Sequence, residues 1–267
     1  MFQRKNQLLS LFILFSFGLF AQETPFISHF SRNDYQGLNQ NWSLGQSSDG
    51  FIFSANSAGL LVADGQNWRK FELPAGQIIR SLSVSAQNKV FTGSVGTFGY
   101  WEKDKFGHFN YLDLAANNLD YLHLKEEFWH ILEKNNDLYF QSFSVIYKWN
   151  NKKVTRITPP GNIMFLQKVG NKIVVPVIGK GLFLLNEENN SFSWIKKSEI
   201  LQNETISFII QDKADWLIGT QLAGVFRYNG RVFTPWENTL NKILKQKKLN
   251  KAIRLKYGSL VLGTVLD

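Results

Sequence analysis

The chain has 267 residues, of which 44% are hydrophobic and 15% aromatic, and its formal net charge is +9 at pH 7. This much apolar material is enough for a sizeable folded core and excludes an intrinsically disordered chain. The sequence contains no cysteine, which excludes disulfides, thiolate metal sites and a cysteine nucleophile.

The first 21 residues have the pattern of a secretory signal peptide. Arg4 and Lys5 precede the apolar stretch LLSLFILFSFGLF, and the small residue Ala21 follows it. A basic start, a short apolar region and a small final residue are typical of such peptides. An uncleaved membrane anchor is the alternative, but the stretch is shorter than the roughly 20 apolar residues that span a bilayer. We therefore predict cleavage after Ala21 and export of residues 22–267.

After this segment the chain repeats one pattern five times. Each copy has four short runs of β-branched and aromatic residues, separated by turns of Asn, Asp and Gly, which tolerate the positive φ of tight hairpins. The copies span 41–73, 79–114, 128–158, 163–195 and 206–236. A glycine recurs near the third run of four copies, where we expect a sharp turn or a close backbone approach: Gly59, Gly99, Gly181 and Gly224.

Four strands repeated about every 40 to 45 residues is the period of a β-propeller blade. We therefore predict an all-β fold, a β-propeller of five complete four-stranded blades and the start of a sixth. The third run of each blade is expected to pack against the neighbouring blade. A β-sandwich is the alternative, but five copies in phase make coincidental spacing a poor explanation.

The sixth copy begins near Lys251 and has only two runs by Asp267. Such a blade would leave a strand edge open. We therefore expect the propeller, residues 22–267, to be incomplete at its C-terminal end and to belong to a longer protein. Closure of the ring by the segment 23–35 is the alternative.

Charged segments are interpreted as solvated. The Lys-rich segment 240–251 is taken as a connector, and the acidic pairs Glu126–Glu127 and Glu187–Glu188 as polar turns rather than as the facing carboxylates of a glycosidase. A basic balance can indicate nucleic acid or acidic glycans, but an exported protein does not normally meet nucleic acid. We predict no nucleic-acid partner for this region.

Motifs of enzyme chemistry are absent from the sequence. The four histidines include neither an HExxH motif nor a pair four residues apart, and there is no nucleophile elbow, P-loop or dinucleotide fingerprint. We predict no catalytic residue, no metal and no cofactor.

The beginnings of the first strands are the most promising binding surface, because in a propeller they converge on the axis at one face. Aromatic rings with a few Arg or His donors suit sugars or acidic small molecules. Packing within the inner ring is the alternative for each residue. The predicted ligand-binding residues are Trp42, Arg80, Trp129, His130, Phe165 and Arg254.

Several phrases resemble a known family. SSDGFIF, NSAGLLVADGQNW and LIGTQLAGVFRYNG resemble the two-component regulator propeller repeat. NDYQGLNQNWSLGQ, FTGSVGTFGYW, EEFWHIL and LNKAIRLKYGSLVLGT are similar to one branch of it. That branch comprises exported sensors with a propeller, a triple-tyrosine domain, one transmembrane helix and a LuxR-type helix-turn-helix; related proteins carry a histidine kinase. The resemblance covers about Thr24 to Asp267.

The resemblance implies the input half of such a sensor. We expect a non-catalytic, periplasmic region of a signal-transduction or transcription regulator that binds an unidentified small molecule or glycan. Dimerisation, membrane attachment and the output, whether DNA binding or phosphotransfer, would lie in other domains. A secreted propeller enzyme (a lyase or glycan-active enzyme) and a structural interaction scaffold are the alternatives.

Overall fold

The structure is a computed structural model that describes residues 27–116, 118 and 125–266. The chain divides into two units, Met1–Ser31 and Arg32–Asp267. The predicted signal peptide, residues 1–21, lies outside the described residues. The second unit holds all of the described helices and strands. None of the described helices combines the length and the apolar character that a membrane crossing needs.

The second unit contains five four-stranded antiparallel sheets and one two-stranded sheet, each formed by consecutive strands. After the short helix α2 (Arg32–Tyr35), blade 1 has β1 (Asn41–Gln46), β2 (Ile52–Asn56), β3 (Gly59–Ala63) and β4 (Trp68–Phe71). Blade 2 has β5 (Ile79–Val84), β6 (Val90–Ser94), β7 (Phe98–Lys103) and β8 (Phe109–Asp113). Blade 3 has β9 (His130–Lys134), β10 (Asp137–Gln141), β11 (Ile146–Trp149) and β12 (Val154–Ile157).

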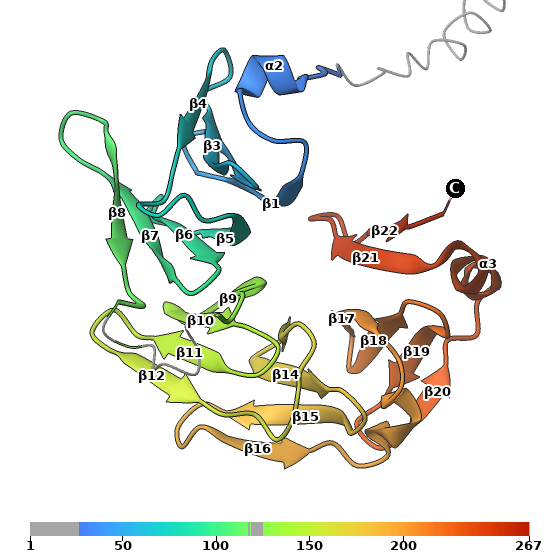
Figure 1. Ribbon diagram of the computed structural model, residues 1–267. Helices are drawn as coiled ribbons and strands as arrows, with labels where there is room; N and C mark the ends of the chain where they lie inside the picture. Colours follow the sequence, from blue (N-terminus) through green and yellow to red (C-terminus); the bar gives the residue numbers. More distant parts are fainter. Residues whose placement is uncertain (1–26, 117, 119–124, 267) are drawn as a thin grey trace, which may run out of the picture. The chain divides into compact units, whose positions relative to one another are not determined.

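Blade 4 has β13 (Gln167–Val169), β14 (Lys172–Val177), β15 (Gly181–Asn186) and β16 (Ser191–Trp194), and the 3-10 helix η2 (Ser198–Leu201) follows it. Blade 5 has β17 (Ile206–Asp212), β18 (Asp215–Thr220), β19 (Gly224–Tyr228) and β20 (Phe233–Pro235). Helix α3 (Thr239–Lys247) then leads to the two strands of blade 6, β21 (Leu249–Arg254) and β22 (Leu260–Thr264). The sheets follow one another around an axis, with the first strands innermost (Figure 1). The predicted propeller, with five full blades and two strands of a sixth, is confirmed.

Local sequence explains the hairpins. Asn135 and Asn136 join β9 to β10 with φ of 51° and 67°, which asparagine adopts readily. Gly59 begins β3 at φ 127°, and a Cβ there would lie 2.3 Å from the carbonyl oxygen of Phe71. Gly99 differs from the expected pattern, because it is the second residue of β7 and its φ is not positive. Glycine is needed there for the close approach of β8 and not for a turn.

The core lies between blades. Each buried cluster joins residues of two neighbours, which is how a sheet buries a face that it cannot bury alone. Between blades 2 and 3, for example, Phe98 stacks on Phe140 with ring centroids 4.5 Å apart, and Tyr100 stacks on Trp149 at 5.5 Å. Trp101, on the third strand of blade 2, packs instead toward blade 1. The expected packing of third strands against neighbouring blades is confirmed.

The Lys-rich segment is not a solvated connector as predicted. It forms α3, capped by Asn238, whose side chain accepts a hydrogen bond from the Leu240 N–H at 2.9 Å. Asn241 and Leu244 are buried against blade 5. The helix is amphipathic, with a narrow buried face and a wide basic one.

Candidate functional site

The first strands of several blades begin with an extra residue. The pairing of β1 with β2 skips Trp42, and the pairing of β5 with β6 skips Arg80. Ser207 in β17 and Asn250 in β21 occupy the same position. A bulge of this kind bends the strand and redirects one side chain. Trp42 and Arg80, both predicted site residues, therefore owe their orientation to a bulge that recurs around the ring.

Arg80 lies between two tryptophans from the neighbouring blades. Its guanidinium carbon is 4.3 Å from the ring centroid of Trp42 and 4.6 Å from that of Trp129, and the two indoles meet edge to face at 5.5 Å. Arg80 Nε also donates a hydrogen bond to Glu127 Oε2 at 3.0 Å, which forms an ion pair. The arginine is 13% exposed, so its charge is held by two rings and one carboxylate. A cation placed over aromatic faces is attracted by their quadrupoles.

The aromatic surface continues from Trp129 into blades 3 and 4. Phe143 lies 6.1 Å from Trp129 and 6.3 Å from Phe165, measured between ring centroids, and His130 stacks on Phe165 at 5.4 Å. We call Trp42, Arg80, Trp129, His130, Phe143 and Phe165 the aromatic–arginine cluster. Phe143 is 39% exposed and the others are partly buried. Five of the six predicted residues thus come together, from four blades.

Hydrogen bonds from buried side chains fix this arrangement. Gln141, fully buried at the end of β10, donates to the Met164 carbonyl and accepts from the Leu166 N–H, both at 2.8 Å. These two bonds hold the backbone on either side of Phe165. Trp42 Nε1 donates to Ser57 Oγ at 3.0 Å. The rings are therefore preorganised rather than free to rotate.

His130 is neutral at pH 7. Burial, with a smaller contribution from the positive charge of Lys251, lowers its pKa to about 4. Its Nε2 atom is buried and makes no hydrogen bond to the described residues. A backbone hydrogen bond with Leu166 partly offsets the lowering of this pKa, so the ring is hydrogen-bonded within the blade stack while Nε2 keeps an unused hydrogen-bonding position.

Arg254 does not join the cluster. It is the last residue of β21, and it donates to Gly258 O at 2.9 Å and to Asp212 Oδ1 at 3.2 Å. Asp212 ends β17, so both residues lie at the opposite ends of the first strands from the cluster. The prediction that Arg254 lies at a strand beginning is wrong. Helix α3 precedes β21 and β21 contains a bulge, so the residues of the sixth copy do not align with those of the other copies.

Neither acidic pair is simply solvated. Glu127 pairs with Arg80, and Glu187 pairs with the buried Lys134 of blade 3. Glu126 accepts a hydrogen bond from Ser144 Oγ. Glu127 and Glu187 therefore neutralise cations of neighbouring blades. Among the described residues, no group of three or more His, Cys, Asp or Glu could hold a metal ion.

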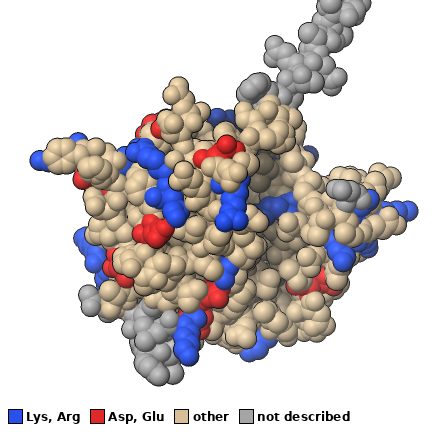
Figure 2. All heavy atoms as spheres, turned by 45° about the horizontal axis from the view of Figure 1, so that its top comes forward, with Lys and Arg blue, Asp and Glu red and all other residues tan. Residues whose placement is uncertain are grey.

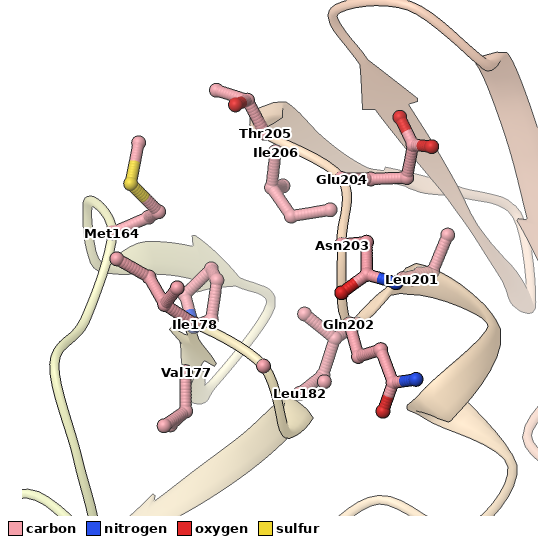
Figure 3. Close-up of a pocket in the computed structure, with 13 residues that line it drawn as sticks. Met164, Val177, Ile178, Leu182, Leu201, Gln202, Asn203, Glu204, Thr205 and Ile206 are labelled. Atoms are coloured by element: carbon pink, nitrogen blue, oxygen red, sulfur yellow. The ribbon is translucent and has the colours of Figure 1, made fainter.

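A pocket of about 290 Å³ opens beside the cluster, between blades 4 and 5 (Figure 3). Met164, the residue before Phe165, lies with Ile178 on one side, and Ile206 faces them from the other. Its rim carries four polar side chains that make no hydrogen bond to the described residues: Gln202, Asn203, Glu204 and Thr205. Figure 3 shows the Glu204 carboxylate pointing away from Met164. The pocket therefore offers an apolar floor and, at its rim, the solvent-exposed amides of Gln202 and Asn203.

Sequence reasoning missed Phe143, Glu127, Lys251 and this pocket. Phe143 lies in the turn between β10 and β11, a position that has no aromatic counterpart in the other copies. Glu127 directly precedes the predicted Phe128–Trp129–His130 run, so its nearness to a strand beginning was the one available signal.

No family model and no curated protein matches the sequence. Among solved structures, the chain is similar to an extracellular domain from B. thetaiotaomicron described as that of the hybrid two component system BT4673, with a TM-score of 0.62 and 16% identity over 84% of this chain and 30% of that one. The corresponding domain of BT3049, from the same organism, has a TM-score of 0.61 and 19% sequence identity. That match covers 92% of this chain and 34% of the other. Virginiamycin B lyase from Staphylococcus aureus has a TM-score of 0.59 and 11% sequence identity, and the match covers 85% of this chain and 86% of the lyase.

These likenesses show the fold. The two B. thetaiotaomicron structures are extracellular domains of proteins described as hybrid two component systems. The chain spans about a third of the length of those two structures, at 30% and 34%.

Proposed function

We propose that this chain is the ligand-sensing input region of an exported bacterial signal-transduction protein, and that the aromatic–arginine cluster contacts the ligand. The observation that carries the proposal is the convergence of ring faces and one guanidinium from four blades at a single place. The solved extracellular domains of two component systems with a similar fold support the same class of function.

The chemistry of the cluster favours a ring-shaped or acidic small molecule, such as a sugar or a carboxylate. Ring faces stack on the apolar faces of sugars, and amides and hydroxyls suit their hydroxyl groups. Phe143 presents an exposed ring, while the nearby pocket adds Asn203 and Gln202. Because Met164 lines the pocket and Phe165 belongs to the cluster, a ligand longer than one ring would contact both.

Signalling adds one requirement. A ligand shifts an equilibrium between two signalling states only if it binds them with different affinity. A cluster built from four blades suits this requirement, since a small change in the angle between blades alters the distances between its rings.

The test is a binding screen by calorimetry with neutral and acidic mono- and oligosaccharides. Trp129→Ala and Arg80→Ala should each weaken a hit at least ten-fold, which corresponds to about 1.4 kcal/mol. Trp194→Ala is the matched control, since Trp194 is an exposed tryptophan on the outer strand β16. Equal affinity in wild type and both cluster variants would show that the ligand binds elsewhere.

The alternative of a propeller enzyme has one observation in its favour, the neutral imidazole of His130 with a buried, unbonded Nε2. A general base needs such a lone pair within reach of substrate. Turnover of a hit from the screen, abolished in His130→Phe while binding persists, would favour an enzyme over a sensor.

A further inference from the structure

The positive charge of this chain is concentrated in one segment. Residues 238–266 contain six lysines and one arginine but no aspartate or glutamate. They therefore carry seven of the nine net charges, and Arg4 and Lys5 carry the other two. The rest of the chain is balanced, with equal numbers of basic and acidic residues. The overall basicity is thus a local property of α3 and blade 6.

These charges are not neutralised by neighbours. Arg254 pairs with Asp212, but none of the six lysines forms an ion pair within the described residues. Unpaired lysines near one another repel, which costs free energy unless a partner compensates for it. In Figure 2 blue spheres of Lys and Arg occur over much of the visible face, among them a group at the right-hand edge, where α3 and β21 lie in Figure 1.

Helix α3 is held rigidly, so its outer face is fixed. The Asn241 side chain accepts from the Val225 N–H at 2.7 Å and donates to the carbonyls of Val225 at 3.1 Å and Trp236 at 2.8 Å. Leu244 is buried in the cluster between blades 5 and 6. Beside this buried side of the helix, two aliphatic side chains are exposed to solvent, Leu240 at 38% and Ile243 at 51%.

We define the basic helix surface by side chains of α3 and its C-terminal end, of which Lys247 is half-buried and the others are exposed: Leu240, Lys242, Ile243, Lys245, Lys247 and Lys248. A hollow of about 490 Å³ adjoins it. Pro235 and Trp236 line one side of the hollow, and Lys242 and Lys245 line the other. The indole N–H of Trp236 makes no hydrogen bond to the described residues, and Glu237 is the one acidic residue of the lining.

We propose that the basic helix surface docks on an anionic phospholipid membrane. The partner must be anionic, because the surface carries four lysines and no acid. It must also accept aliphatic side chains, which a soluble anion does not. A basic helix with exposed aliphatic residues and a neighbouring tryptophan is the combination that lies flat in a lipid headgroup region. The inference is independent of any ligand at the aromatic–arginine cluster.

The experiment is co-sedimentation of the chain from Gln22 onward, the predicted product of signal cleavage, with lipid vesicles. One set consists of phosphatidylcholine and the other of phosphatidylcholine mixed with phosphatidylglycerol. We expect binding to the anionic set alone, and release by salt, because screening shortens the reach of the lysine charges. Equal binding to both sets would overturn the proposal.

Charge-reversal variants locate the surface. Lys242→Glu/Lys245→Glu should lower binding about ten-fold or more. The matched control is Lys152→Glu/Lys153→Glu, which changes the net charge equally in an exposed turn of blade 3. A similar loss in the control would mean that net charge, rather than this surface, governs binding. If the first variant fails to fold, as judged by thermal unfolding, Lys247→Gln/Lys248→Gln tests the same surface.

A third arm separates a membrane from a soluble anion. Leu240→Ser/Ile243→Ser should weaken vesicle binding several-fold while leaving its salt dependence unchanged, because these side chains supply only the apolar contact. Inorganic pyrophosphate is the soluble probe. Tight, lysine-dependent pyrophosphate binding without vesicle binding would replace the membrane by a phosphorylated ligand.

Discussion

Lys134, at the end of β9, forms an ion pair with Glu187 of blade 4, and its side chain is only 3% exposed. The Tyr139 hydroxyl donates a second hydrogen bond to the same carboxylate at 3.0 Å. Burial, together with this bond, raises the pKa of Tyr139, so the phenol remains a donor. The blade 3–4 boundary therefore contains a buried lysine, Lys134, whose charge is neutralised by the carboxylate of Glu187.

Lys134→Met should lower the free energy of unfolding by about 3 kcal/mol, because it leaves Glu187 partly buried without its cation. The double variant Lys134→Met/Glu187→Gln should recover part of the loss. Urea unfolding measures both. Lys70→Met, which breaks an exposed pair with Glu72, is the control and should change little. An equal effect of the two single variants would contradict the role assigned to the buried pair.

Glycine at the start of the third strand makes a second prediction. Gly59→Ala should cost about 2 to 4 kcal/mol, since φ is 127° and the added Cβ would lie 2.3 Å from the Phe71 carbonyl oxygen. Gly50→Ala is the matched control, because φ is 90° there but nothing lies within 4 Å of the added Cβ. Thermal unfolding of Gly50→Ala measures the effect of backbone strain alone, and thermal unfolding of Gly59→Ala measures the effect of strain together with the clash.

A third prediction concerns the guanidinium between the indoles. Arg80→Lys keeps the charge but loses the planar group that faces Trp42 and Trp129. The free energy of unfolding should fall by about 1 to 2 kcal/mol. Arg69→Lys, on the exposed outer strand β4, should leave it unchanged. Equal stability of Arg80→Lys and wild type would show that a point charge suffices at this position.

The architecture could be predicted because its causes are local and repeated. Turn residues such as Asn135 and Asn136, and the alternation of polar turns with apolar runs, occur within a few residues and recur in phase. The same repetition located Trp42, Arg80 and Trp129, since aligned copies place equivalent strand beginnings at one face. Site residues that have no counterpart in the other copies could not be predicted in this way.

The errors have a common physical origin in contacts between blades and in departures from the repeat. Lys134 and Glu187 are 53 positions apart, and nothing near either one indicates its partner. Helix α3 interrupts the repeat before blade 6, so an alignment of the copies places Arg254 at the wrong end of its strand. The two buried side chains of α3, Asn241 and Leu244, are too few to make its periodicity evident among lysines.

The last prediction follows from His130, whose pKa is about 4 in the folded chain instead of the ordinary 6.5. Below pH 6.5 the unfolded chain takes up a proton at this imidazole, whereas the folded chain does not until about pH 4. Stability should therefore fall as the pH drops from 6.5 to 4, by up to about 3 kcal/mol from this group. Above pH 6.5 the group contributes no pH dependence.

His130→Phe removes the titrating group while keeping a ring to stack on Phe165. Urea unfolding between pH 4 and pH 8 should show a shallower loss of stability on the acid side than in wild type, with parallel curves above pH 7. The comparison of slopes cancels the carboxylates, which titrate alike in both proteins, and any constant change in packing. Identical slopes would mean that His130 is protonated as readily in the folded chain as in the unfolded one, and that its imidazole is solvated rather than enclosed by the cluster.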